Sequence, residues 1–208
     1  MRLAVLGDSI AWGQGAARER DRLESRLTEG LTMRGFDVEA RVFAVRGARS
    51  SDLAAQVGRA STWKPVLAVV VIGANDLTHL TPVDQAAQDL AQAVRRLRAV
   101  GAEVVVAPAP DLSAVPHVPV ALRTAVRAAG EFLRQRQETA VLAEGGRIAD
   151  PDQRASRAFA ADPSLFSADR FHPSSAGYAV IADSLLPVLA EAAQDLTSID
   201  TSAQAGPA

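Results

Sequence analysis

The sequence predicts an α/β protein in which a doubly wound parallel sheet lies between two layers of helices. Short apolar runs alternate along the chain with longer segments whose apolar residues recur every three to four positions, as in amphipathic helices. The apolar runs lack polar alternation, which is typical of parallel strands covered on both faces. Strands separated by helices of this length favour right-handed crossovers, with helices on both faces of the sheet.

The expected elements follow one another in regular order. Apolar runs predict five strands, of which the third is the most apolar and the fifth the weakest, at residues 3–6, 38–45, 66–72, 103–107 and 139–142. Periodicity and capping residues predict helices at residues 18–34, 51–57, 82–100 and 119–137, and a last helix from 174 onward. Pro187 is expected to kink or end that last helix.

The chain length of 208 residues suits a single domain. We expect this domain to cover residues 1–194 and residues 195–208 to form a flexible C-terminal tail, because the last residues are small and polar. Residues 144–170 show no clear periodicity. A long irregular segment in a compact domain usually marks a functional loop.

The composition argues against several function classes. A formal net charge of −2 gives no electrostatic reason to expect nucleic acid or an anionic membrane as a partner. The absence of cysteine excludes disulfides and thiolate catalysis. No apolar run approaches the roughly 20 residues that span a bilayer, and the chain begins directly with a strand pattern. We therefore expect a cytoplasmic protein without stable membrane insertion, whose oligomeric state the sequence does not indicate.

The first strand ends abruptly at Gly7-Asp8-Ser9, and this places Ser9 just past its carboxyl end. In open α/β sheets ligands bind at that edge, in the crevice where the strand order reverses. Gly7 allows a sharp turn there, so that the Ser9 hydroxyl is presented to the crevice. Ser9 is the candidate nucleophile, but a serine needs a base and oxyanion donors before it reacts.

The rest of the chain offers those partners on loops of the same edge. His172 is the candidate base, because a neutral imidazole accepts a serine proton at neutral pH. Asp169 lies three residues earlier and can reach the far ring nitrogen of His172, where it would fix the tautomer. The candidate oxyanion donors are the backbone N–H groups of Ser9 and Gly47 and the side-chain amide of Asn75.

Four short motifs together resemble the SGNH hydrolases, also called GDSL-type hydrolases. They are Gly7-Asp8-Ser9-Ile10, Gly47, Gly73-Ala74-Asn75-Asp76 and Asp169-Arg170-Phe171-His172, and their order and spacing match over residues 1–189. A single motif of this kind is weak, whereas four in order on the expected loops are a strong signal. Ala44 and Val45 stand where many members have an asparagine, so the second loop departs from the family pattern at this point.

The resemblance implies a flavodoxin-like three-layer α/β/α fold with a five-stranded sheet in the order 2-1-3-4-5. It implies hydrolysis of a small-molecule ester or thioester through an acyl-serine, without a metal or an organic cofactor. Carried over by position, Ser9, His172 and Asp169 form the catalytic triad. Ser9, Gly47 and Asn75 form the oxyanion hole.

Other residues near these motifs have competing interpretations. Asp76 and His79 form a second Asp-x-x-His that could supply the base, although Asp76 is better explained as an anchor of its loop and His79 as a residue at the substrate entrance. Asp8 fits a capping role better than a catalytic one. Trp12 could form a wall of the pocket, with a packing role as the alternative.

Three further residues lie in loops where substrate could bind. Arg46 and Arg49 flank Gly47 and could recognise an anionic substrate, with a solvated position as the alternative. His117, in the loop broken by prolines, fits a surface position. From this and the preceding group of residues we take Trp12, Arg49 and His79 as the candidate substrate-contacting residues.

Two alternatives to ester hydrolysis stay open at this point. An acyltransferase would use the same residues with an acceptor alcohol in place of water. A non-catalytic module would bind an acylated or carbohydrate ligand in the same pocket. The acyl and alcohol portions of the substrate are not indicated, although loops 77–81, 107–119 and 144–168 are the expected determinants of specificity.

Overall fold

A computed structural model describes residues 1–204, with the side chains of residues 1–198. It contains one five-stranded parallel sheet in the order β2-β1-β3-β4-β5, as predicted. The strands are β1 (Arg2–Gly7), β2 (Glu39–Val42), β3 (Leu67–Val71), β4 (Glu103–Ala107) and β5 (Arg147–Ile148). The three central strands are almost completely buried, which explains their uninterrupted apolar sequences.

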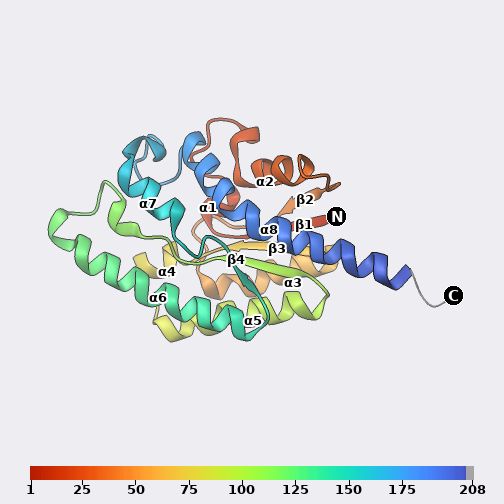
Figure 1. The fold of residues 1–208 in the computed structure, drawn as a ribbon. Helices are drawn as coiled ribbons and strands as arrows, with labels where there is room; N and C mark the ends of the chain where they lie inside the picture. Colours follow the sequence, from red (N-terminus) through yellow and green to blue (C-terminus); the bar gives the residue numbers. More distant parts are fainter. Residues whose placement is uncertain (205–208) are drawn as a thin grey trace.

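The helices connect these strands and cover both faces of the sheet (Figure 1). The α-helices are α1 (Ser9–Trp12), α2 (Leu23–Thr32), α3 (Leu53–Trp63), α4 (Ala74–Thr78), α5 (Val83–Ala99), α6 (Arg123–Ala143), α7 (Arg154–Ala161) and α8 (Ser175–Gln204). Short 3₁₀ turns are η1 (Glu19–Asp21), η2 (Ser50–Asp52), η3 (Leu112–Ala114), η4 (Val120–Leu122) and η5 (Pro163–Leu165).

Alternate residues of each strand divide the core into two layers. Leu3 and Val5 of β1 pack on one face with apolar side chains of α2 and α8. Ala4 and Leu6 pack on the other face with α3 and α5. Figure 1 shows α2 and α8 on one side of the sheet and α3, α5 and α6 on the other. This three-layer α/β/α arrangement leaves the carboxyl ends of the strands free at one edge.

The prediction of a fifth strand at residues 139–142 is wrong, because these residues belong to α6. Leu133, Gln137 and Val141 are buried at a spacing of four residues, which is a helical pattern. The Thr139 hydroxyl donates to the Gln135 carbonyl oxygen one turn earlier, so this threonine is accommodated within the helix. The fifth strand is the two-residue β5, inside the segment that the sequence indicated as irregular.

The segment 144–170 is also more regular than expected, since it contains β5, the eight-residue helix α7 and the turn η5. Ala155 and Phe159 of α7 pack at helical spacing against the core on the α8 side. The spacing of four residues between Ala155 and Phe159 was the one feature of the sequence that indicated α7.

Helix α8 does not end at Pro187 but continues through it to Gln204. Proline removes one backbone hydrogen bond, to the carbonyl of Asp183, and both residues lie on the exposed side of the helix where water can solvate that carbonyl. The opposite side is held by buried Leu185, Leu186 and Leu189. Residues 195–204 of the expected tail are likewise helical, and residues 205–208 lie outside the described part of the chain.

Helix α8 is the one described helix whose length and composition would allow it to cross a membrane. Its segment Ser175–Ser198 has a mean hydropathy of 1.3, but 61% of the apolar window is buried inside the fold. Burial of this kind is typical of the core helix of a globular domain. The cytoplasmic location stays a prediction.

Candidate active site

Ser9 lies at the carboxyl end of β1 as the first residue of α1, on a turn that requires glycine before it. Gly7 has φ +130°, and a Cβ atom at this position would lie 1.9 Å from the Val71 carbonyl oxygen. The side chain of Asp8 caps α1 by accepting a hydrogen bond from the Ile10 N–H at 2.9 Å, as the sequence indicated. The turn therefore fixes the Ser9 hydroxyl at the edge of the sheet.

The structure brings Ser9, His172 and Asp169 together across 163 residues of sequence. His172 Nε2 lies 3.1 Å from Ser9 Oγ, and His172 Nδ1 lies 2.6 Å from Asp169 Oδ2. The other oxygen, Asp169 Oδ1, accepts hydrogen bonds from the Phe171 and His172 N–H groups and from the Ser167 hydroxyl, each at 2.9 Å. This network holds the carboxylate in one orientation behind the imidazole.

The hydrogen bonds around Asp169 also determine its charge. Partial burial raises the pKa of this carboxyl, but the hydrogen bonds from His172, Phe171 and Ser167 outweigh burial and hold the pKa well below its ordinary value. Asp169 is therefore ionised over the whole neutral range. An ionised carboxylate at 2.6 Å favours the proton on Nδ1 of His172, which leaves Nε2 as an acceptor facing Ser9.

The loops after β2 and β3 lie on either side of the Ser9 turn and are bonded to each other. Asn75 Nδ2 donates to the Ala48 carbonyl oxygen at 3.0 Å. The buried carboxylate of Asp76 accepts hydrogen bonds from the Ser50 N–H at 3.0 and 3.2 Å and from the Ser50 hydroxyl at 2.8 Å. Gly47 has φ +78°, with no atom within 4 Å of where its Cβ would lie. The loop after β2 is thus open to solvent at Gly47 and is anchored to the loop after β3 through Ala48 and Ser50.

The rival pair of Asp76 and His79 is not formed. Asp76 is directed to Ser50, while His79 Nδ1 lies 2.9 Å from the Asn75 carbonyl oxygen. Burial raises the pKa of Asp76, and the hydrogen bonds from Ser50 offset part of that increase. Asp76 is therefore the loop anchor that the sequence favoured, and His79 is held at the exposed end of α4.

Two contacts around the site had no signal in the sequence because they join distant segments. His117 Nε2 lies 2.9 Å from the Asp169 carbonyl oxygen, so the proline-broken loop touches the turn that carries the carboxylate. The buried Tyr178 hydroxyl donates to the Gln14 carbonyl oxygen at 2.7 Å, and so fixes the loop that packs beside His172. Burial raises the pKa of Tyr178, with further contributions from Asp8 and Asp169, and the hydroxyl stays neutral.

Asp8 is the other buried titratable group of the site. Its Oδ2 atom has no hydrogen-bond partner among the described residues. Burial, with a smaller contribution from the charge of Asp76, raises the pKa of Asp8 to about 7. The capping residue thus changes its charge near neutral pH although it makes no direct contact with His172.

An apolar cavity of about 80 Å³ lies on the β4 side of Ser9. Its walls include Ile10, which follows the nucleophile, and Phe171, which precedes His172, together with Leu112, Val115 and Phe159. A second apolar cavity of about 70 Å³ shares Ile10 with the first and continues toward the core. Two of the three loops expected to determine specificity, 107–119 and 144–168, contribute to these walls, while no residue of 77–81 lines either cavity.

The remaining candidates lie on the β2 side of Ser9. Trp12 contacts two guanidinium groups, those of Arg22 at 5.0 Å and Arg46 at 5.1 Å from its ring centroid. Arg49 is exposed, and its backbone N–H donates to Asp52. Within the described residues, no group of three His, Asp or Glu side chains is arranged to hold a metal ion.

Comparisons with known proteins identify the family of this chain. The model of the GDSL-like lipase/acylhydrolase family matches residues 5–180. The GDSL-like esterase Rv1075c of Mycobacterium tuberculosis is 38% identical over 196 residues, which cover 92% of this chain and 62% of that protein, so the chain spans under two thirds of the relative's length.

Solved structures show the same fold at lower identity. TesA has a TM-score of 0.74 at 21% identity, over 92% of this chain and 99% of TesA. LAE5, an α/β hydrolase enzyme from the metagenome of Lake Arreo in Spain, has a TM-score of 0.70 at 19% identity, over 89% of this chain and 93% of LAE5. Since the family model covers most of its residues, the chain belongs to the GDSL-like lipase/acylhydrolase family.

Proposed function

We propose that this protein is a serine esterase that hydrolyses a carboxylic ester through an acyl-serine intermediate. The observation that carries the proposal is the continuous hydrogen-bonded line from Asp169 through His172 to Ser9, at 2.6 and 3.1 Å. Such a line lets a base remove the serine proton while a carboxylate stabilises the resulting imidazolium. The apolar cavities beside Ser9 suit the acyl portion of an ester.

In the first half of the reaction, Ser9 Oγ attacks the ester carbonyl carbon as its proton moves to His172 Nε2. The carbonyl oxygen becomes an oxyanion, for which the Ser9 and Gly47 N–H groups and Asn75 Nδ2 are the donors. The intermediate then collapses, the bond to the alcohol oxygen breaks, and His172 gives its proton to the leaving alcohol. Ser9 is left acylated.

In the second half, His172 accepts a proton from water while the water oxygen attacks the acyl carbon. Collapse of this intermediate breaks the bond to Ser9 Oγ, which recovers its proton from His172, and the carboxylic acid leaves. The Asn75 side chain supports the assignment of the oxyanion donor. One of its two amide hydrogens is used by the Ala48 carbonyl, which orients the amide and leaves the second hydrogen for the substrate.

Hydrolysis of p-nitrophenyl esters from acetyl to long-chain acyl tests the proposal, with Ser9→Ala and His172→Ala beside the wild type. We expect both variants to lose turnover while circular dichroism shows an intact fold, and the best chain length to measure the acyl cavity. Unchanged turnover in Ser9→Ala would refute the proposal. A folded wild type that neither hydrolyses any ester nor reacts at Ser9 with a serine-directed phosphonate would favour a binding module. Product analysis with added glycerol separates hydrolysis from acyl transfer.

A further inference from the structure

Gln56 is a buried polar residue on the apolar face of α3. Its side chain is 1% exposed, and Leu53 and Val57 on the same face of the helix are completely buried in the core. A glutamine in such a position costs free energy unless its amide is hydrogen-bonded. The partner of this amide is the backbone of Gly7, two residues before Ser9.

Both hydrogen-bonding groups of the Gln56 amide contact this one residue. The Gly7 N–H donates to Gln56 Oε1 at 2.8 Å, and Gln56 Nε2 donates to the Gly7 carbonyl oxygen at 2.9 Å. The side chain therefore bonds the end of β1 as the backbone of a neighbouring strand would. The two bonds together allow a single orientation of the amide, because its oxygen only accepts and its nitrogen only donates.

Helix α3 replaces one bond of the parallel ladder between β1 and the segment that leaves β2. The Phe43 N–H donates to the Val5 carbonyl oxygen at 2.8 Å, and two residues later the Val45 N–H donates to the Gly7 carbonyl oxygen at 3.0 Å. The regular pattern of parallel strands would have the Gly7 N–H donate to the Phe43 carbonyl oxygen between these two bonds. That oxygen instead accepts from the Arg59 guanidinium of α3 at 3.0 Å. The ladder is thus interrupted just before the turn that carries the nucleophile.

The peptide between Gly7 and Asp8 is held at both ends. Its carbonyl oxygen accepts from the Val45 N–H and from Gln56, and its N–H donates to the Val71 carbonyl oxygen at 3.1 Å. Gly7 has φ +130°, so the turn toward the nucleophile begins at this peptide. Without the Gln56 amide, the Gly7 N–H has no partner and the carbonyl oxygen loses one of its two donors. The turn is then free to rotate.

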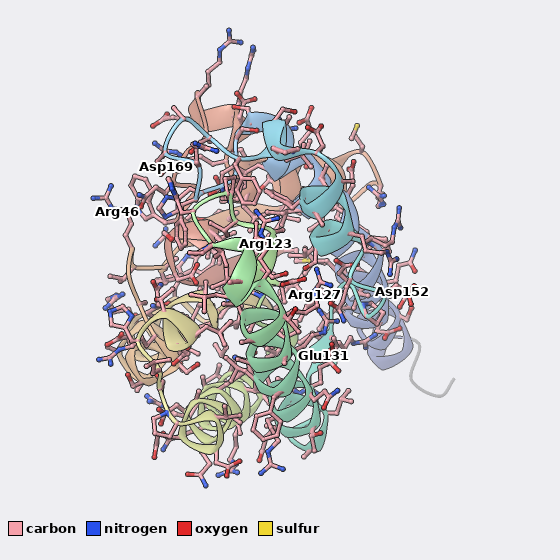
Figure 2. The ribbon with its side chains drawn as sticks, turned by 90° about the vertical axis from the view of Figure 1, so that its left-hand side faces the viewer. Arg46, Arg123, Arg127, Glu131, Asp152 and Asp169 are labelled. Carbon is pink, nitrogen blue, oxygen red and sulfur yellow. The ribbon has the colours of Figure 1, made fainter. Side chains whose placement is uncertain are left out.

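We propose that Gln56 is a positioning residue that holds the turn of Ser9 in the geometry needed for attack on the ester. This inference rests on the proposed esterase function, because the geometry of the turn matters for catalysis only if Ser9 reacts. The amide lies where β1 meets the segment that leads to Gly47, so it bears on two of the three expected oxyanion donors. Figure 2 shows Arg46, which precedes Gly47, and Asp169 of the proposed triad toward the same side of the molecule.

The test compares Gln56→Met, which removes both hydrogen bonds and nearly keeps the length of the side chain, with the wild type. We expect kcat for p-nitrophenyl acetate to fall about 10–100-fold with little change in KM, because a displaced oxyanion donor weakens binding of the transition state and not of the ester. Inactivation of Ser9 by a phosphonate, which forms a tetrahedral oxyanion mimic, should slow by a similar factor.

Val57→Ala is the matched control, because it removes buried methyl groups from the next position of α3 without removing a hydrogen bond. It should lower Tm by several degrees and keep the wild-type kcat and phosphonate rate. Gln56→Asn is the second variant in case Gln56→Met does not fold. Its amide stops about 1.5 Å short of that of glutamine, so it cannot keep both bonds to Gly7, and the same losses are expected.

A loss of kcat and of phosphonate rate in a folded Gln56 variant, with Val57→Ala unaffected, supports the inference. A Gln56 variant that lowers Tm but keeps the kcat and the phosphonate rate of Val57→Ala would overturn it, since Gln56 then only stabilises the fold. Turnover in those samples would leave the esterase proposal standing. A folded wild type that neither hydrolyses any ester nor reacts with the phosphonate would overturn both.

Discussion

The link between Asp76 and Ser50 should control catalysis, although neither residue touches Ser9. Asp76 accepts from the Ser50 N–H at 3.0 and 3.2 Å and from the Ser50 hydroxyl at 2.8 Å, and both residues are about 1% exposed. The bond joins the loop of Gly47 to the loop of Asn75. The distance between the two expected oxyanion donors therefore depends on this carboxylate.

The size of the effect follows from the bonds that Asp76→Asn removes. Hydrogen bonds to a charged acceptor contribute about 1.5–3 kcal/mol each. The amide of asparagine keeps one accepting oxygen, so roughly one of the two donors of Ser50 loses its partner. A loss of about 2 kcal/mol lowers Tm by about 4–8 °C in a domain of this size. Complete loss of one oxyanion donor costs about 100–1000-fold in kcat, so a displaced donor should cost about 10–100-fold.

Steady-state hydrolysis of p-nitrophenyl acetate measures this prediction, with thermal unfolding of the same samples. We expect Asp76→Asn to lower kcat with little change in KM, and to slow inactivation by a phosphonate, which forms a tetrahedral oxyanion mimic. Asp52→Asn is the control, since its carboxylate accepts from the Arg49 N–H in the same turn without touching the Asn75 loop. If Asp76→Asn lowers Tm but retains the kcat and the phosphonate rate of Asp52→Asn, the residue only stabilises the fold.

Three further predictions concern the turn and the triad. The pKa of Asp8 rises from 3.8 to about 7 on folding, so its contribution to stability is lost progressively as the pH rises from 3.8 to 7 and stays lost above pH 7; Asp8→Asn should raise the free energy of unfolding by about 4 kcal/mol at pH 8 and by little at pH 4 in urea titrations. A gain independent of pH would contradict this linkage. Gly7→Ala places Cβ 1.9 Å from a carbonyl oxygen and should cost more than about 4 kcal/mol, whereas Gly35→Ala, with a free surrounding, should cost about 1–3 kcal/mol by the same titrations. Asp169→Asn should lower kcat about 10⁴-fold at unchanged fold, because asparagine stabilises the wrong tautomer of His172; retention of kcat would remove Asp169 from the triad.

Much of the fold and the placement of the site could be predicted because both follow from local patterns. Buried parallel strands have continuous apolar sequences, and their carboxyl ends must share an edge. The positions of Ser9, Asn75 and His172 just after predicted elements therefore predicted that all three lie at the same edge of the sheet. The spacing of three between Asp169 and His172 also sufficed, since one turn spans it.

The parts that could not be predicted depend on packing between distant segments. The sequence around Val141 fits a strand or a helix equally well, and contacts with the core on the α5 side decide for the helix. Proline usually breaks a helix, but three buried leucines hold α8 together around Pro187. The contacts of Arg46 with Trp12 and of His117 with the Asp169 carbonyl leave no trace in local composition.

The order of the strands explains why this edge can hold both the proposed triad and the proposed oxyanion donors. β1 comes first in the chain but lies between β2 and β3 in the sheet. The turn at Ser9 is therefore flanked by the Gly47 loop on one side and the Asn75 loop on the other, and donors from both can face one substrate oxygen. In a sheet ordered 1-2-3, Ser9 would lie beside only one of these loops. Neither of these loops supplies the proposed base, His172. It lies in the loop before α8, which reaches the same edge of the sheet 163 residues after Ser9.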